Sequence, residues 1–299
     1  MSAVIQSATT PGTPGTPRET SGTRLAVRRF LRNRLAVAGL GVVAFFVLFC
    51  FVGPLVYSTD QTHTTLQQVN LSPSGAHWLG TDAVGHDELG RLMYGGKVSL
   101  VVGLAAGVLA TVIGTLWGAA AGYAGGWIDA VMMRIVDAGI AIPALFILLV
   151  VSAITTPGPA GLILILGLVS WLVPSRLIRA ETLSLKNRDY VLTLRAIGGT
   201  HARAILRHIL PNSVSTVIVA TTFQIADAIL LVAYVSYLGL GVQPPATDWG
   251  GMLSAGLTAA YSGYWWLILS PGLAIILVVW AFNAIGDGLR DAFDVRGRG

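Results

Sequence analysis

Long apolar runs without charged residues dominate this sequence, and they constrain the fold more than any other feature. A helix that crosses a lipid bilayer needs about 20 consecutive, mostly apolar residues. The first such run, Leu35–Tyr57, holds no charged residue, and two later runs are longer. Charged residues make up 11% of the whole chain, against about 25% in soluble domains. We therefore predict an all-α integral membrane protein.

The apolar runs and the breaks between them predict six transmembrane helices. The uncharged run over residues 138–175 is too long for one span, and Pro157-Gly158-Pro159 divides it into two helices. The predicted helices lie at about residues 35–57, 98–122, 134–156, 160–179, 213–238 and 264–285. An even number of spans puts both termini on the same side of the membrane.

The beginning of the chain has a different composition. Residues 1–22 contain a Thr-Pro-Gly repeat, which cannot bury enough apolar surface to fold. The first apolar run is too long for the apolar region of a signal peptide, so we expect none ahead of it. We therefore predict a disordered cytoplasmic tail at residues 1–23 and a transmembrane domain at residues 24–299.

Basic residues fix the predicted orientation, because Lys and Arg concentrate in cytoplasmic loops. Of the 19 Lys and Arg residues, all but Arg91 and Lys97 fall on the side that carries the two termini. That side is predicted to be cytoplasmic. The net charge of +5 is then explained by membrane topology, and we expect no binding to nucleic acid.

A polar and basic stretch, residues 180–212, separates the fourth and fifth predicted helices. Asp189–Ala196 can form a short helix, and Gly198 with Gly199 interrupts it because glycine disfavours a helix interior. A second helix is predicted at His201–Leu210, ended by a proline. The expected structure is a helix, a glycine turn and a helix at the membrane surface.

Three motifs in this stretch carry a family resemblance: Tyr190-Val191, Arg195-Ala196-Ile197-Gly198 and Ile209-Leu210-Pro211-Asn212. They resemble the cytoplasmic coupling loop of permease subunits in binding-protein-dependent ABC importers. The family usually has Glu-Ala-Ala after the Tyr-Val, where this chain has Leu192-Thr193-Leu194. The resemblance implies that the loop docks on an ATPase through Tyr190, Leu192, Leu194, Arg195, Gly198, Gly199, Arg203, Arg207 and Pro211. Ile197 and Ile205 are expected to add to the apolar contact surface.

Two segments on the opposite side are similar to the dipeptide and oligopeptide branch of that family, in its second permease subunit. The first contains His77-Trp78-Leu79-Gly80-Thr81-Asp82 and Gly85-His86-Asp87. The second runs from Gly239 through Gln243-Pro244-Pro245 to Asp248-Trp249-Gly250-Gly251. Its glycines and prolines predict tight turns that re-enter the membrane edge without a helix. The expected outer-face residues are Asp82, Asp87, Gln243, Pro244 and Trp249.

The residues of the first segment and those that follow it suggest two other chemistries. A metal ion could bind four of its side chains, but their spacing matches no tight ligand pattern, so no metal site is expected: His77, Asp82, His86 and Asp87. Gly96-Lys97 is similar to the end of a phosphate-binding loop. That motif needs Gly at position 91 and Ser or Thr at position 98, where this chain has Arg91 and Val98. ATP binding by this chain is therefore not expected.

Charged residues near or inside the predicted spans suggest specific roles. Arg134 and Asp137 are three residues apart on a helix and can pair. Asp227 lies in the middle of the fifth predicted helix. Because an ionised carboxylate at bilayer depth is costly, Asp227 should face protein or water. It either lines a translocation cavity or the contact with a second permease, or it is neutral or locally hydrogen-bonded.

No arrangement of nucleophile and base, paired carboxylates or metal ligands points to an enzyme. The resemblance implies a multi-pass permease subunit of an ABC importer in a bacterial cell membrane, which moves peptides or similar solutes by alternating access. It also implies a homologous second permease, two cytoplasmic ATPase subunits that bind ATP and Mg, an extracytoplasmic substrate-binding protein and surrounding lipid. The alternatives are an ion-coupled secondary transporter that uses Asp227, and a membrane scaffold without transport. Dipeptides, longer peptides and metal chelates all remain open as solutes.

Overall fold

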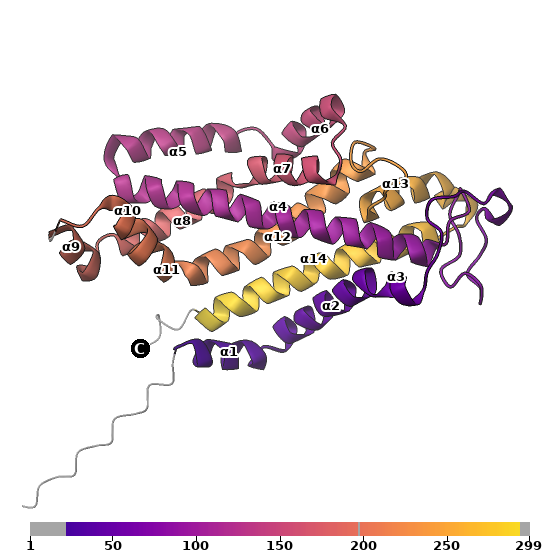
Figure 1. Cartoon of the computed structure of the whole chain (residues 1–299), viewed down its shortest axis with the longest axis horizontal. Coiled ribbons are helices and arrows are strands. Elements are labelled where there is room, and N and C mark those ends of the chain that lie inside the picture. Colours follow the sequence, from indigo (N-terminus) through magenta and orange to yellow (C-terminus); the bar gives the residue numbers. More distant parts are fainter. Residues whose placement is uncertain (1–21, 197, 294–299) are drawn as a thin grey trace, which may run out of the picture.

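A computed structural model describes residues 22–196 and 198–293 of the chain (Figure 1). These residues form helices joined by turns, and no β-strand occurs among them. The α-helices are α1 (Gly22–Arg32), α2 (Arg34–Phe51), α3 (Gly53–Val56), α4 (Glu88–Ala124), α5 (Gly126–Ile140), α6 (Ala144–Thr155), α7 (Pro159–Ser170), α8 (Leu172–Leu185), α9 (Asp189–Ala196), α10 (His201–Ala204), α11 (Leu210–Asn212), α12 (Val214–Tyr237), α13 (Trp249–Ala259) and α14 (Trp266–Phe293). Short 3₁₀ turns lie at Leu66–Gln68 and Ala260–Ser262, and Ile205–Ile209 is a π-helical turn. The predicted all-α fold is confirmed.

Four helices are long and apolar enough to cross a membrane by themselves: α2, α4, α12 and α14. The pair α5 and α6 and the pair α7 and α8 each pass the same test together, but they bend by 72° and 45° at their breaks. The described chain therefore has four to six candidate spans. The count of six stays a prediction, because it depends on whether each bent pair crosses the bilayer as one span.

The third and fourth predicted spans were wrong in one respect, because each was predicted as one continuous helix and each is divided between two helices. The third, residues 134–156, is two helices, because Pro143 ends α5 and starts α6. A proline lacks the backbone N–H that a continuous helix needs and disfavours helical geometry in the residue before it. The fourth, residues 160–179, is also broken, and its second half, α8, continues to Leu185. The predicted polar stretch at residues 180–212 therefore begins within a helix.

The 37-residue helix α4 is the centre of the fold, and it packs mainly against α8, α12 and α7. It begins at Glu88, well before the predicted residue 98, because the Asp87 carboxylate caps it by accepting a hydrogen bond from the Gly90 backbone N–H at 2.9 Å. Two glycines allow neighbouring helices to approach closely. A Cβ atom would lie 2.8 Å from the Ile225 backbone at Gly107 and 2.3 Å from a backbone oxygen of α8 at Gly118.

Two apolar cores hold the long helices together. The larger core joins α2, α4, α12, α13 and α14 around Phe46, Leu100 and Trp249. The second core joins α4, α6, α7 and α12 around Val102, Leu148 and Leu166. Exposed apolar side chains remain on most helices, as expected for surfaces that face lipid or a partner.

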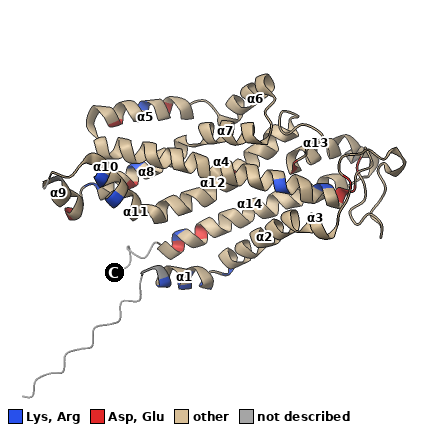
Figure 2. Cartoon of the chain, in the orientation of Figure 1, with Lys and Arg blue, Asp and Glu red and all other residues tan. Residues whose placement is uncertain are grey.

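The elongated molecule has two distinct ends (Figure 1). One end carries α9, α10 and α11 together with the start of α1 and the end of α14, and we call it the α9 end. The other end carries α3, α13 and the irregular residues 57–87, and we call it the α13 end. Charged residues gather at these ends and along α5, while the middle of the molecule is nearly free of them (Figure 2). This pattern is typical of a bilayer-spanning protein.

Two helices and one ion pair differ from what the sequence predicts. The amphipathic helix α1 precedes the first predicted span. The predicted helix-free turns after Gly239 end in the helix α13. Asp137 does not pair with Arg134, its neighbour on the same helix, but with Arg176 of α8. The predicted tail at residues 1–23 lies almost wholly outside the described residues.

Candidate functional site

The polar segment at the α9 end has the predicted helix, turn and helix. Helix α9 ends near Gly198, whose φ of +79° is a left-handed conformation that glycine adopts without strain. The Thr200 hydroxyl caps the next helix by accepting a hydrogen bond from the Arg203 backbone N–H at 3.3 Å. That helix passes through a π-helical turn and continues past Pro211 to Asn212, so the proline does not end it.

A small apolar core anchors this segment to the transmembrane helices. It consists of Tyr123, Leu185, Val191, Leu194, Ala204 and Ile209, with Ile205 packed against it. Leu194 is 8% exposed and cannot offer a contact surface, which corrects the expectation for this residue. Leu192 at 47% and Leu206 at 61% are the exposed leucines. The segment is therefore a packed unit with its own apolar outer surface.

Most of the other residues predicted to contact an ATPase lie within the described part of the chain. Arg203 and Arg207 are exposed and available to a partner. Tyr190 is 40% exposed, and its ring lies 6.2 Å from that of His208. Gly199 packs against Leu194, whose side chain a Cβ atom would meet at 2.5 Å. The Arg195 side chain and Ile197 lie outside the described residues.

One ion pair and one hydrogen bond fix the base of this segment to the α4–α5 connection. The Arg179 guanidinium donates two hydrogen bonds of 2.6 Å to the Asp129 carboxylate. The Lys186 ammonium donates a hydrogen bond of 2.8 Å to the Gly122 carbonyl oxygen. The α4–α5 connection is therefore a structural support for α8, which leads directly into the polar segment.

Asp227 lines a cavity of about 340 Å³ in the middle of the molecule. Both helix breaks open into it, through Pro143 between α5 and α6 and through Ser170 at the end of α7. The buried Ser170 hydroxyl has no hydrogen-bond partner among the described residues, and the Gln224 side chain also lines the cavity. Asp227, Gln224, Ser170 and Tyr234 thus bring polar groups into one mostly apolar space. The break at Pro143 was missed, although a proline inside an uncharged run was a usable signal.

At the α13 end, Asp87 fastens the irregular residues 57–87 to α4. Besides capping that helix, its carboxylate accepts a hydrogen bond of 2.9 Å from the Tyr57 hydroxyl and lies 2.9 Å from the His77 Nδ1 atom. Burial and the Asp87 carboxylate raise the pKa of Tyr57 to about 12, so its hydroxyl remains a donor. Asp87 therefore has a structural role within this part of the chain.

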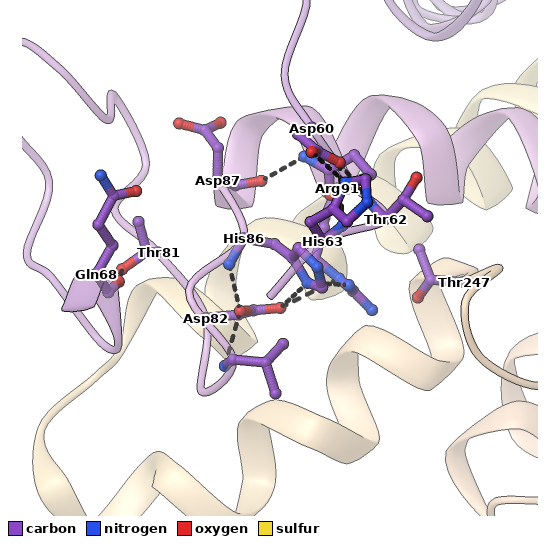
Figure 3. Close-up of polar contacts among 12 residues, drawn as sticks. Asp60, Thr62, His63, Gln68, Thr81, Asp82, His86, Asp87, Arg91 and Thr247 are labelled. Atoms are coloured by element: carbon purple, nitrogen blue, oxygen red, sulfur yellow. Dashed lines mark hydrogen bonds and ion pairs between the residues drawn. The ribbon is translucent and has the colours of Figure 1, made fainter. Parts of the chain in front are cut away.

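Asp82 organises the neighbouring turn, as Figure 3 shows. One carboxylate oxygen accepts hydrogen bonds from the backbone N–H groups of Val84, at 3.0 Å, and His86, at 2.8 Å. The other oxygen lies 3.3 Å from the Arg91 Nε atom. The described part of the chain has no group of three or more His, Cys, Asp or Glu side chains that could hold a metal ion.

The second outer segment is more buried than expected. Trp249 is fully buried, its indole N–H donates to the Leu92 carbonyl at 3.0 Å, and its backbone N–H donates to the Ser99 hydroxyl at 3.1 Å. Trp249 is therefore a core residue and not a free outer-face contact, because α13 turns it into the larger core. The side-chain amide N–H group of Gln243 donates hydrogen bonds to the carbonyl oxygens of Gly239 and Gly241. Pro244 lines a second cavity, at the α13 end.

Comparison with known protein families covers most of the chain. The family described as "Binding-protein-dependent transport system inner membrane component" matches residues 114–299. The family described as "N-terminal TM domain of oligopeptide transport permease C" matches residues 21–73. The first match contains the polar segment and Asp227, and the second contains α1, α2 and α3.

Individual relatives match nearly their whole length. A protein of Brucella suis biovar 1, whose name assigns it provisionally as a peptide permease, is 42% identical over 94% of this chain and 93% of the relative. The dipeptide transport system permease protein DppC of Bacillus subtilis is 37% identical over 92% of this chain and 86% of the relative. The oligopeptide transport system permease protein OppC of the same species is 36% identical, covering 90% and 88%. The chain belongs to the family of binding-protein-dependent transport system inner membrane components.

Proposed function

We propose that this chain is a permease subunit of an ATP-driven importer that moves peptides across the cell membrane. The observation that carries the proposal is the match, over about nine-tenths of the chain, to permeases named for dipeptide and oligopeptide transport. The subunit itself performs no covalent chemistry and binds no nucleotide. ATP and Mg are bound by two ATPase subunits, a homologous permease completes the channel, and a binding protein delivers the solute.

The polar segment between α8 and α12 is the proposed contact with an ATPase. Its apolar core and the bonds that hold α8 make it rigid enough to transmit a movement. Leu192 and Leu206 present exposed apolar side chains, and Arg203 and Arg207 present exposed cations. The segment continues through α11 almost directly into α12, the helix that carries Asp227. A displacement of the segment would therefore reach the Asp227 cavity along one chain of helices.

The α9 end is proposed to be cytoplasmic, with both termini on that side. This assignment rests on the predicted topology, in which nearly all Lys and Arg residues lie on the side of the membrane that carries the α9 end. The ATPases then contact the α9 end and the binding protein contacts the α13 end. The described helices make the chain a multi-pass membrane protein whichever way it faces.

Asp227 is proposed to face the translocation path. Its carboxylate is exposed in the single chain, although it lies within an otherwise apolar helix. A peptide ammonium group could pair with it as access switches from one side to the other. The ion-coupled alternative would use the same residue as a proton or sodium carrier, but the relatives that cover this chain are named as permeases of peptide transport systems.

Reconstitution tests the proposal. This chain, its partner permease, the two ATPases and the binding protein are placed in proteoliposomes, and uptake of a labelled dipeptide is measured. We expect uptake to require ATP and the binding protein and to be unaffected by a protonophore or a sodium ionophore. Uptake that persists without ATP and stops with an ionophore would support the ion-coupled alternative instead.

A further inference from the structure

Helix α1 has an inner face that packs on the protein and an outer face that stays exposed in the described chain. On the inner face, Ala26 is 8% exposed, and a Cβ atom at Gly288 of α14 would lie 3.4 Å from the Phe30 ring. Asn33 separates α1 from α2, because its side-chain oxygen caps α2 by accepting a hydrogen bond of 3.1 Å from the Leu35 backbone N–H. Helix α1 is therefore a separate short helix, held against the end of α14.

Two neighbouring rows of side chains form the outer face of α1. Residues four positions apart lie on the same side of a helix. One row consists of Arg24, Arg28 and Arg32, which are all exposed. The other row consists of Val27 and Leu31, which are 54% and 60% exposed. All five side chains line one open hollow of about 410 Å³. Cations and apolar side chains therefore border the same space.

The positive charge of α1 has no acidic counterpart in the described part of the chain. Figure 2 shows only basic charge along this helix, and the sequence contains no Asp or Glu from residue 20 to residue 59. Asp287 and Asp291, near the end of α14, are exposed and form no ion pair with α1. Four arginines of α1 are therefore available to an anion from outside the chain: Arg24, Arg28, Arg29 and Arg32.

A row of cations beside a row of apolar side chains matches the boundary between the phosphate groups and the acyl chains of a lipid leaflet. Basic amphipathic helices bind at this boundary, and anionic lipids strengthen their binding. The exposed apolar surface continues from Leu31 to Leu35 and Leu40 of α2, a helix that is long and apolar enough to cross the membrane. A purely acidic protein surface would match the arginines but not the apolar row. The observations therefore favour lipid as the occupant of this face.

We propose that the outer face of α1 binds the phosphate group of an anionic phospholipid, in the leaflet that adjoins the α9 end. Arg24, Arg28 and Arg32 donate hydrogen bonds to the phosphate oxygens, because guanidinium groups match phosphate geometry. Val27 and Leu31 contact the adjoining part of the acyl chains. Phosphatidylcholine carries a cation beside its phosphate and should bind more weakly. The proposal does not depend on the transported solute or on which side of the membrane the α9 end faces.

Photo-crosslinking of the full-length chain in phosphatidylcholine vesicles tests this site. The vesicles contain a small, equal fraction of photoactivatable phosphatidylglycerol or phosphatidylcholine, both with the same diazirine-bearing acyl chain, and peptide mass spectrometry measures the labelling of α1. We expect phosphatidylglycerol to label α1 at least about fivefold more than phosphatidylcholine, since one basic residue near an anionic surface contributes about that factor. The combined variant Arg24→Gln, Arg28→Gln and Arg32→Gln should remove the preference. Gln has nearly the helix propensity of Arg, so α1 should still form.

A matched control removes the same charge from three exposed arginines on separate elements: Arg134→Gln, Arg188→Gln and Arg290→Gln. The control should keep the preference for phosphatidylglycerol at α1. Equal labelling by both lipids in the wild type, or equal loss of preference in both variants, would overturn the proposal. Absence of labelling by either lipid would overturn it in favour of a protein partner. Loss of labelling in excess glycerol 3-phosphate would assign the site to a soluble phosphate compound and overturn the lipid assignment.

Discussion

Arg179 of α8 and Asp129 of α5 form a bidentate ion pair in which both hydrogen bonds are 2.6 Å long. The two residues are 50 positions apart in the sequence, and the pair ties the α4–α5 connection to the helix that enters the polar segment. Such bidentate contacts fix orientation as well as adding energy. The support of the proposed ATPase contact therefore includes a connection that lies far from the polar segment in the sequence.

We predict that Asp129→Asn lowers the free energy of unfolding by about 2 kcal/mol, because the Arg179 guanidinium loses charge-assisted hydrogen bonds in a partly buried position. Thermal unfolding in detergent measures the effect. The control is Asp137→Asn, which breaks the pair with Arg176. Both partners of that pair are about half exposed, so the loss should be about 0–1 kcal/mol. Equal losses in the two variants would contradict the prediction.

Leu192 and Leu194 should respond differently to the same substitution. Leu194→Ala opens a space in the small apolar core and is expected to cost about 2–5 kcal/mol of stability. Leu192→Ala removes an exposed side chain, so the protein should remain stable while ATPase binding weakens. Stability in detergent and co-purification of the ATPase subunits report the two effects. Normal ATPase binding by Leu192→Ala would remove this residue from the proposed contact.

Gly198→Val should leave the protein in the membrane but reduce hydrolysis of ATP stimulated by loaded binding protein by roughly fivefold or more. The left-handed backbone at Gly198 costs a branched residue about 1–2 kcal/mol. Apart from its two chain neighbours, no atom of the described residues lies within 4 Å of the added Cβ, so the strain acts on the turn itself. Gly263→Val is a matched control, since Gly263 has a φ of +85° and equally open surroundings near α13. If Gly198→Val retains full stimulated hydrolysis and uptake, the coupling element must lie elsewhere.

Asp227→Asn separates the proposed transport roles of this carboxylate. If it meets the ammonium group of a peptide, uptake of dipeptides should fall about tenfold, by the loss of one charge-assisted hydrogen bond, while ATP hydrolysis without substrate is unchanged. Uptake and hydrolysis are measured in the same proteoliposomes. Asp137→Asn again serves as the control, because Asp137 lies outside the Asp227 cavity. Wild-type uptake of several dipeptides by Asp227→Asn would leave the residue without a role in transport.

Membrane orientation can be measured by labelling engineered cysteines in intact cells with a thiol reagent that does not cross the membrane. We expect Ser74→Cys, at the α13 end, to be labelled and Ser184→Cys, near the α9 end, to be protected; both positions are exposed in the structure. The single native cysteine, Cys50, is fully buried and gives little background. The reverse labelling pattern would place the α9 end outside the cell.

Local features of the sequence determined the class of fold and much of the polar segment. Long apolar runs located α2, α12 and most of α4 and α14, because residues that cross a bilayer must be mostly apolar whatever they pack against. Helix α9 and the turn at Gly198 also followed from their own residues, since glycine conformation and helix propensity act over a few positions. These predictions needed no knowledge of the neighbouring elements.

Tertiary structure decided two things that hydropathy does not encode: which way each side chain faces and which distant residue it contacts. Leu192 and Leu194 are equally apolar in sequence, yet only Leu194 enters the small core, because the rotation of α9 against α8 selects one side. Asp137 had a possible partner three residues away, but the bend between α5 and α6 and the packing on α8 bring it to Arg176. The cavity at the α13 end likewise joins Gln61, His86 and Glu88 to α13 and α14, which lie more than 150 residues further along the chain. Such sites depend on how distant helices pack, and no single stretch of this sequence determines that packing.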